Sequence, residues 1–248
     1  MSFTLHQVER SDSQWNAMFH TLCEAFENPL QPMFRLFRLL PPPTAGPEAK
    51  AASFQAFCDG MKYGLGGGPE CIWQKVLDAQ GNVIGGALWK IYESDPFANQ
   101  LEGQEETASW YPEGGRRDFV AAAISRLDEG RKKFATRGHI YLNILWTLPE
   151  WQRKGVGKVV MEWGVQKAEE LGLEMWLEAS PYGKRLYEQQ GFTSVMVTDL
   201  SPPQEPPNQE WAEIKGELGE MIEVVMWRPR EGPYQEGKSV KPWEKGGS

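Results

Sequence analysis

The chain has 248 residues, of which 40% are hydrophobic, and its formal net charge is -8. This length fits one large domain, and the composition allows a sizeable core. The acidic balance excludes a global basic footprint for nucleic acid, and no apolar run approaches the ~20 residues that span a bilayer. Three cysteines do not make a disulfide framework, and residues 1–10 lack an apolar signal region. We therefore expect a cytoplasmic protein.

The first 91 residues contain five segments with the apolar periodicity of strands or helices. These segments are strands over residues 3–8, 72–77 and 83–91, and helices over residues 11–26 and 47–63. Ser11 or Asp12 is positioned to cap the first helix. An apolar segment over residues 34–40 ends at three consecutive prolines, because proline lacks the amide N–H.

Residues 94–137 resemble an insertion, with a polar loop at 94–115 followed by apolar residues at helical spacing up to Phe134. Residues 139–148 then form the strongest predicted strand. Its side chains are apolar on both sides, which is typical of a central strand covered twice. We expect one face of it to carry Ile140, Leu142, Ile144, Trp146 and Leu148.

The remaining chain alternates between predicted helices and strands. Helices are expected over residues 156–171 and 182–190, and strands over residues 174–179, 193–198 and 222–227. Gly172 and Gly191 are placed as left-handed helix caps. Residues 229–248 have little apolar content and predict a flexible tail, which leaves residues 1–228 as a single domain.

A glycine-rich turn joins the central strand to the helix over residues 156–171. Gly155 and Gly157 lack a Cβ, so the backbone can approach a ligand closely. A helix start offers unpaired amides and a positive dipole end, which together attract an anion. Arg153, Lys154 and Lys158 add positive charge. The turn therefore predicts a phosphate-bearing ligand.

Two common phosphate-binding motifs do not match this turn. The nucleotide-hydrolase loop G-x-x-x-x-G-K-[ST] needs a hydroxyl residue after the lysine, but Val159 follows Lys158, and Gln152 replaces the first glycine. A dinucleotide fingerprint needs a third glycine, where this chain has Val160. The turn is therefore of another class.

Two motifs together resemble the GNAT superfamily of N-acetyltransferases. The sequence Q-R-K-G-V-G at residues 152–157 is similar to the family's Q/R-x-x-G-x-G/A motif. The sequence L-Y-E-Q-Q-G-F at residues 186–192 is similar to its second signature, L-Y-E-x-x-G-F. They occur in the expected order, separated by one helix and one strand. The strong part of the resemblance covers residues 139–192.

The resemblance implies an α/β fold with a mixed, mostly antiparallel sheet, flanked by helices, in which two parallel central strands splay apart. Acetyl-CoA would lie in that gap as co-substrate, with its diphosphate on the glycine turn. The cofactor-binding residues that the resemblance implies are Leu145, Trp146, Thr147, Gln152, Arg153, Lys154, Gly155, Val156, Gly157, Lys158, Ser180 and Lys184.

The resemblance also implies catalytic roles for Tyr187 and Glu178. A tyrosine near its usual pKa of ~10 is a competent acid beside a departing thiolate, although Tyr187 could instead pack its helix onto the sheet. Glu178 resembles the base of ribosomal-protein N-terminal acetyltransferases, but Ser180 stands where the family usually has Asn. A structural Glu178, with His139, Asn143 or a water as the base, remains an alternative.

The predicted activity is acetyl transfer from acetyl-CoA to the primary amine of a small molecule, by direct attack in a ternary complex. Alternatives are acetylation of protein N-termini or lysines, and a non-catalytic acyl-CoA-binding module. Trp110 and Tyr111 could bind the acceptor or pin their loop. No metal-ligand spacing occurs. We expect a monomer or homodimer, without nucleic-acid or membrane partners.

Overall fold

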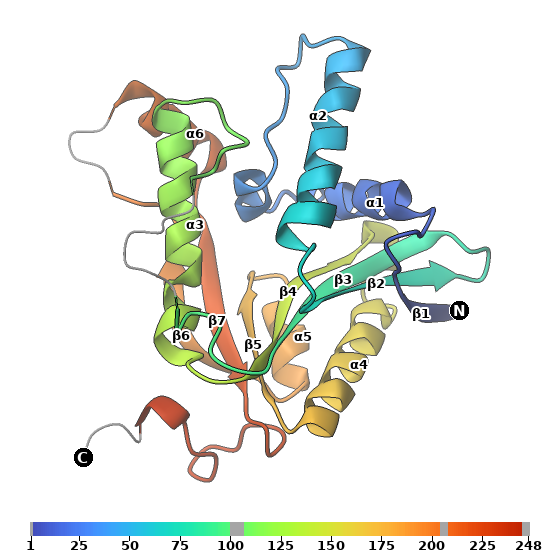
Figure 1. Cartoon of the computed structure of the whole chain (residues 1–248), viewed down its shortest axis with the longest axis vertical. Helices are drawn as coiled ribbons and strands as arrows, with labels where there is room; N and C mark the ends of the chain where they lie inside the picture. The colour runs from blue at the N-terminus through green and yellow to red at the C-terminus, as the bar shows by residue number, and fades with distance from the viewer. Residues whose placement is uncertain (1, 100–106, 204–207, 245–248) are drawn as a thin grey trace.

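The computed structural model describes residues 2–99, 107–203 and 208–244 (Figure 1). It contains a seven-stranded sheet in the order β1-β2-β3-β4-β5-β7-β6. The strands are β1 Phe3–Gln7, β2 Cys71–Asp78, β3 Val83–Tyr92, β4 His139–Thr147, β5 Glu174–Ala179, β6 Thr193–Asp199 and β7 Ile222–Arg228. Neighbouring strands are antiparallel except β4 and β5, which are parallel. The predicted mixed, mostly antiparallel sheet is confirmed.

Helices flank this sheet, as predicted. The α-helices are α1 Trp15–Glu27, α2 Pro47–Asp59, α3 Gly115–Phe134, α4 Val156–Leu171, α5 Lys184–Gln189 and α6 Gln209–Leu218. Shorter helical segments are η1 Pro32–Leu36, η2 Gly60–Leu65, η3 Pro149–Trp151 and η4 Pro242–Glu244. Gly172 and Gly191 have φ values of 63° and 86°, which confirms both predicted left-handed caps.

Two details of the helices differ from the sequence predictions. Gln14 is the N-cap of α1, and Asp12 accepts a hydrogen bond from its amide at 2.8 Å, so the cap predicted at Ser11 or Asp12 was wrong. Helix α6 was not predicted. Its N-cap is Asn208, whose side chain accepts a hydrogen bond from the amide of Trp211 at 2.8 Å.

The two faces of the sheet are covered by different helices (Figure 1). Helix α4 packs against β3 and β4 on one face, and α1 packs against the same strands on the other. Trp89 on β3 is fully buried beneath α4. A Cβ on Gly164 of α4 would lie 2.2 Å from the Trp89 ring, so this glycine allows the close approach.

A β-bulge changes the direction of the side chains along β4. Leu142 pairs with Trp89 and Ile144 pairs with Leu88, which leaves Asn143 as the extra residue. Ile140 and Leu142 pack in the cluster under α4, whereas Ile144 and Trp146 pack in the cluster under α1. The prediction that these side chains share one face was therefore wrong, because one inserted residue reverses the alternation.

The parallel strands β4 and β5 separate partway along their length. They are paired only from His139 with Glu174 to Leu142 with Leu177. Strand β4 then continues to Thr147, while β5 continues to Ala179 paired with β7. The predicted splay is confirmed and begins at the bulged Asn143.

Residues 229–244 lie against the end of the sheet. The amide of Tyr234 donates to the carbonyl of Gly191 at 2.9 Å, and the Trp243 ring lies 5.1 Å from the Trp227 ring and 5.5 Å from the Trp176 ring. The division into a domain of residues 1–228 and a flexible tail stays a prediction. Within the described ranges, no helix is long and apolar enough to cross a membrane.

Candidate active site

The glycine turn before α4 is open to a ligand. Gly155 is the N-cap of α4 with a φ of 96°, and no side chain caps this helix. The first intrahelical bond runs from the amide of Val159 to the carbonyl of Gly155 at 3.1 Å. The amides of the first helical turn consequently point outward without an intrahelical acceptor. Arg153 also has a positive φ, 59°, so left-handed residues stand on both sides of Lys154, and such alternation of right- and left-handed backbone can form an anion-binding concavity.

A cavity of about 640 Å³ lies between this turn, the end of β4 and α5. It is lined by most of the predicted cofactor residues, namely Leu145, Trp146, Thr147, Gln152, Arg153, Gly155, Val156, Gly157, Lys158 and Ser180. Lys154 and Lys184 do not line it. The Lys154 ammonium lies 5.3 Å from the Trp151 ring, and Lys184 forms an ion pair with Glu188.

This first cavity suits an elongated ligand that carries a phosphate group. The anion would meet the open helix start, with Arg153 and Lys158 beside it. Beyond Leu142, β4 has no strand paired on its β5 side in the part of the chain that the structure describes. Its backbone groups at Leu145 and Thr147 are therefore placed to hydrogen-bond an extended arm, as a neighbouring strand would.

Tyr187 lines the same cavity from α5 and is 8% exposed. Burial raises the pKa of its phenol well above 10, and the carboxylate of Glu223 raises it further. A Cβ on Gly183 would lie 2.8 Å from Cε2 of Tyr187, so this glycine leaves room for the ring. The phenol is therefore protonated at neutral pH but is a weaker acid than an ordinary tyrosine, so the expectation that its pKa lies near the usual ~10 was wrong.

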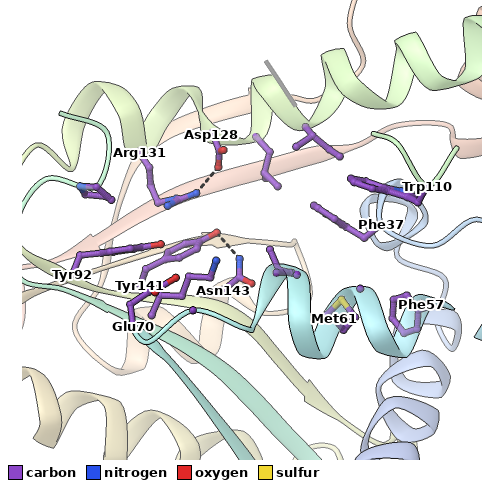
Figure 2. Close-up of a pocket in the computed structure, with 18 of the residues that line it drawn as sticks. Phe37, Phe57, Met61, Glu70, Tyr92, Trp110, Asp128, Arg131, Tyr141 and Asn143 are labelled. Atoms are coloured by element: carbon purple, nitrogen blue, oxygen red, sulfur yellow. Dashed lines mark hydrogen bonds and ion pairs between the residues drawn. The ribbon is translucent and has the colours of Figure 1, made fainter. Parts of the chain in front are cut away.

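A second cavity of about 880 Å³ lies over β3 and β4, between α2 with η2 and α3 (Figure 2). One end is apolar and is lined by Phe37, Leu39, Phe57, Met61 and Trp110. The other end is polar and is lined by Glu70, Lys90, Tyr92, Asp128, Arg131, Tyr141 and Asn143. The cavity thus matches an amphipathic molecule with one polar end.

Trp110 and Tyr111 differ in their positions. Trp110 lines the apolar end, is 39% exposed and donates a hydrogen bond from its indole to the carbonyl of Leu36 at 2.9 Å. Tyr111 is buried, and its hydroxyl donates to the carbonyl of Arg35 at 2.7 Å. Trp110 is therefore placed to contact a ligand, and Tyr111 to hold the loop.

Glu178 lies beneath the polar end of the second cavity and lines neither cavity. Its side chain is 4% exposed. The Tyr141 hydroxyl donates to Oε2 of Glu178 at 2.6 Å, and Nε of Arg131 donates to Oε1 at 3.0 Å. Burial raises the pKa of Glu178, while the positive charge of Arg131 opposes that rise. Both carboxylate oxygens are thus engaged.

Three further polar groups lie around this network. Burial lowers the pKa of His139 to about 4, and its Nδ1 lies 2.7 Å from the carbonyl of Arg137. Asn143 donates to the Tyr141 hydroxyl at 3.3 Å. Burial, together with the nearby Glu178, raises the pKa of Glu223 to about 8. The neutral, fully buried His139 fits a structural role better than that of a base.

Neighbouring stretches of β4 line the two cavities. Tyr141 and Asn143 line the second cavity, whereas Leu145, Trp146 and Thr147 line the first. The bulge at Asn143 separates these stretches and coincides with the start of the splay. The polar end of the second cavity therefore lies where β4 and β5 separate.

A profile of the acetyltransferase (GNAT) family matches residues 30–192, which include both motifs. The chain belongs to the GNAT family of acetyltransferases. The matched residues contain β4, the glycine turn, α4 and α5. The family assignment, made first from the two motifs, is therefore confirmed, and it indicates transfer of an acetyl group to an amine.

Solved structures share the GNAT fold. A histone acetyltransferase HPA2 and related acetyltransferase from Corynebacterium glutamicum is 20% identical with a TM-score of 0.53, covering 96% of this chain and 99% of that chain. Arylalkylamine N-acetyltransferase 2 from Aedes aegypti is 14% identical with a TM-score of 0.57, covering 93% and 100%. A comparison with curated protein sequences finds no match.

Sequence reasoning did not find every polar residue around this GNAT site. Arg131 lies on α3 and Tyr141 on β4, and both are buried beside Glu178. Glu223 comes from β7, far along the chain. The one sequence signal that could have revealed such a buried polar residue is a charged residue within an apolar strand pattern, as at Glu223. The described residues contain no cluster of three or more acidic, histidine or cysteine side chains that could hold a metal.

Proposed function

We propose that the protein is an acetyl-CoA-dependent N-acetyltransferase that acetylates a primary amine of a small molecule by direct attack in a ternary complex. The observation that carries this proposal is that neighbouring stretches of β4 line two cavities where β4 and β5 separate. One cavity has the features of a diphosphate site, and the other is amphipathic. Two substrates can therefore be held at once, with their reacting ends at Asn143.

Acetyl-CoA would supply the activated acetyl group as a thioester. The amides of Val156, Gly157 and Lys158 and the side chain of Arg153 would hold its diphosphate. The backbone from Leu145 to Thr147 would pair with its extended arm. Gln152, Gly155 and Ser180 line the same cavity and complete its walls. Lys154 and Lys184 do not line this cavity. In this proposal Lys154 adds only to the positive field around it, and the charge of Lys184 is offset by Glu188.

The chemistry requires the removal and the delivery of a proton. An alkylammonium with a pKa near ~10 must lose a proton before it attacks, and Glu178 is the proposed acceptor. The amine nitrogen then bonds to the acetyl carbon, and the carbon–sulfur bond breaks. Tyr187 is the proposed donor to the departing thiolate. Its burial in the first cavity supports that role.

The second cavity supports a small acceptor with an apolar body. Its volume of about 880 Å³ falls within the ~300–1,000 Å³ of small-molecule sites. Phe37, Phe57 and Trp110 line its apolar end, and the polar end lies at the splay. A protein substrate would instead need an open, peptide-length groove. We further propose a cytoplasmic monomer or homodimer.

Thiol release from acetyl-CoA, measured with a panel of small primary amines and with peptides carrying free N-termini or lysines, tests this function. We expect release with amines that bear an aromatic or aliphatic body. Release with peptides alone would overturn the small-molecule proposal. CoA binding by calorimetry without release under any condition would instead indicate a non-catalytic binding module.

The variant Tyr187→Phe separates catalysis from binding. Because only the phenolic oxygen is removed, we expect kcat to fall by about 100-fold or more while CoA affinity changes little. An unchanged kcat would assign Tyr187 to packing alone.

A further inference from the structure

We propose that Tyr141 is a catalytic residue that takes the proton of the acceptor amine and passes its own phenolic proton to Glu178. This inference rests on the proposed function and adds a group that the two family motifs do not contain. It depends on which atoms of the network reach the acceptor cavity.

Tyr141 connects the buried carboxylate to the cavity. Its side chain lines the polar end, where Figure 2 shows it between Arg131 and Asn143. Its hydroxyl donates to Oε2 of Glu178 at 2.6 Å. Glu178 does not line the cavity, so the Tyr141 oxygen is the point at which an amine can meet this proton acceptor.

The position of Tyr141 also matches the place where the thioester is expected. Leu142, the next residue, forms the last β4 pair with β5, and the strands separate at Asn143. Glu178 follows Leu177 at the corresponding point of β5. The relay therefore lies at the apex of the splay, on the side of the acceptor cavity.

Neighbouring groups fix the geometry of the relay. The Arg131 guanidinium lies 3.7 Å from the centre of the Tyr141 ring and donates to Oε1 of Glu178 at 3.0 Å. Asp128 forms an ion pair with Arg131 from the same helix. The amide of Asn143 donates to the Tyr141 oxygen at 3.3 Å. When the substrate binds, the N–H of its ammonium group would replace the Asn143 amide as the hydrogen-bond donor to the Tyr141 oxygen.

The other titratable groups around the relay lie on or beside the sheet. Lys90 on β3 is paired with Tyr141 across the strands and lines the cavity with Tyr92 and Glu70. Glu223 on β7 lies near Glu178, and its raised pKa of about 8 keeps it protonated at neutral pH. Arg131 is held by two carboxylates, so it compensates the negative charge of Glu178 before transfer and that of Asp128 after it.

The proton balance closes within the site. The acceptor ammonium gives one proton to the phenolic oxygen of Tyr141 as the phenolic proton moves to Oε2 of Glu178. The neutral amine then forms the C–N bond and the C–S bond breaks. After the C–S bond breaks, the amide nitrogen carries one excess proton and the sulfur carries a negative charge. Tyr187 donates its phenolic proton to the thiolate, and the excess proton of the nitrogen then replaces it on Tyr187. Glu178 returns its proton to solvent after product release.

Replacement of Tyr141 by Phe removes the relay and keeps the ring beneath Arg131. With 2-phenylethylamine, or the best acceptor of the amine panel, we expect kcat to fall by about 100-fold with an unchanged KM for acetyl-CoA. The kcat of Glu178→Gln should fall by a similar factor. The kcat of the double variant should be no lower than that of the less active single variant, because both changes remove the same relay. Tyr111→Phe, which loses a different buried phenol hydrogen bond, should retain kcat within about twofold.

The outcomes separate this inference from the proposed function. Full activity of Tyr141→Phe beside an inactive Glu178→Gln would overturn the relay and leave the proposed function intact, as would multiplicative losses in the double variant. If Tyr141→Phe does not fold, a proton inventory of the wild-type enzyme, in which kcat is measured in mixtures of H₂O and D₂O, tests the relay. Two protons in flight give a curved dependence of kcat on the fraction of D₂O, and a linear dependence overturns the relay.

Discussion

The variant Gly155→Ala tests the proposed anion site at the start of α4. Gly155 has a φ of 96°, a left-handed conformation that costs a non-glycine residue about 1–2 kcal/mol. A Cβ there would meet only Cζ of Phe3 at 3.7 Å, an ordinary contact, so the cost is conformational rather than steric. Relaxation of this φ would turn the amides of Val156 and Gly157 away from the anion.

The expected loss in CoA affinity follows from these amides. A hydrogen bond to a charged group contributes about 1.5–3 kcal/mol, so the loss of one amide contact weakens CoA binding by roughly 10- to 100-fold. Gly172→Ala is the matched control, because Gly172 ends the same helix with a φ of 63° and no atom within 4 Å of the added Cβ. It should lose about 1 kcal/mol of stability and retain CoA affinity.

Isothermal titration calorimetry with CoA and urea unfolding measure these two quantities. We expect both variants to be destabilised and only Gly155→Ala to bind CoA more weakly. Equal CoA affinity for wild type and Gly155→Ala would refute the reasoning that the turn binds the diphosphate. Equal weakening in both variants would show that helix strain, rather than the anion site, controls binding.

Two further variants test the environment of the site. Burial raises the pKa of Glu223 to about 8 from an ordinary 4.5, so the folded state keeps a proton that the unfolded state releases, and stability falls as pH rises through this window. In urea unfolding, Glu223→Gln should therefore be more stable than wild type by on the order of 3 kcal/mol at pH 7 and about equally stable at pH 4.5. Unfolding free energies that change with pH in the same way in both proteins would contradict this. Trp110→Ala should raise the KM for an apolar amine about tenfold without changing the KM for acetyl-CoA, and equal changes in both would place Trp110 outside the acceptor site.

The glycine turn and the last helix motif could be predicted from the sequence because their signals are local. Gly155 takes a conformation that glycine favours, and its neighbours along the chain form the rest of the turn. The strand before it and the helix after it follow from apolar periodicity. The family, the splayed sheet and part of the lining of the first cavity therefore followed from residues 139–192, although Lys154 and Lys184 do not line that cavity.

The polar end of the second cavity could not be found in this way. Arg131, Tyr141 and Glu178 come from α3, β4 and β5, and only their packing brings them together. The side-chain directions along β4 also depend on the bulge at Asn143, which forms when β4 pairs with β3. A period-two pattern cannot show such an extra residue.

By itself, then, the sequence determined most of the elements, the glycine turn and the family, because each depends on residues close together in the chain. Only the tertiary structure decided which side chain lies between the second cavity and the buried Glu178. The reason is physical: a proton relay needs donor and acceptor within about 3 Å of each other, and the pairing of separate strands and a distant helix sets that distance.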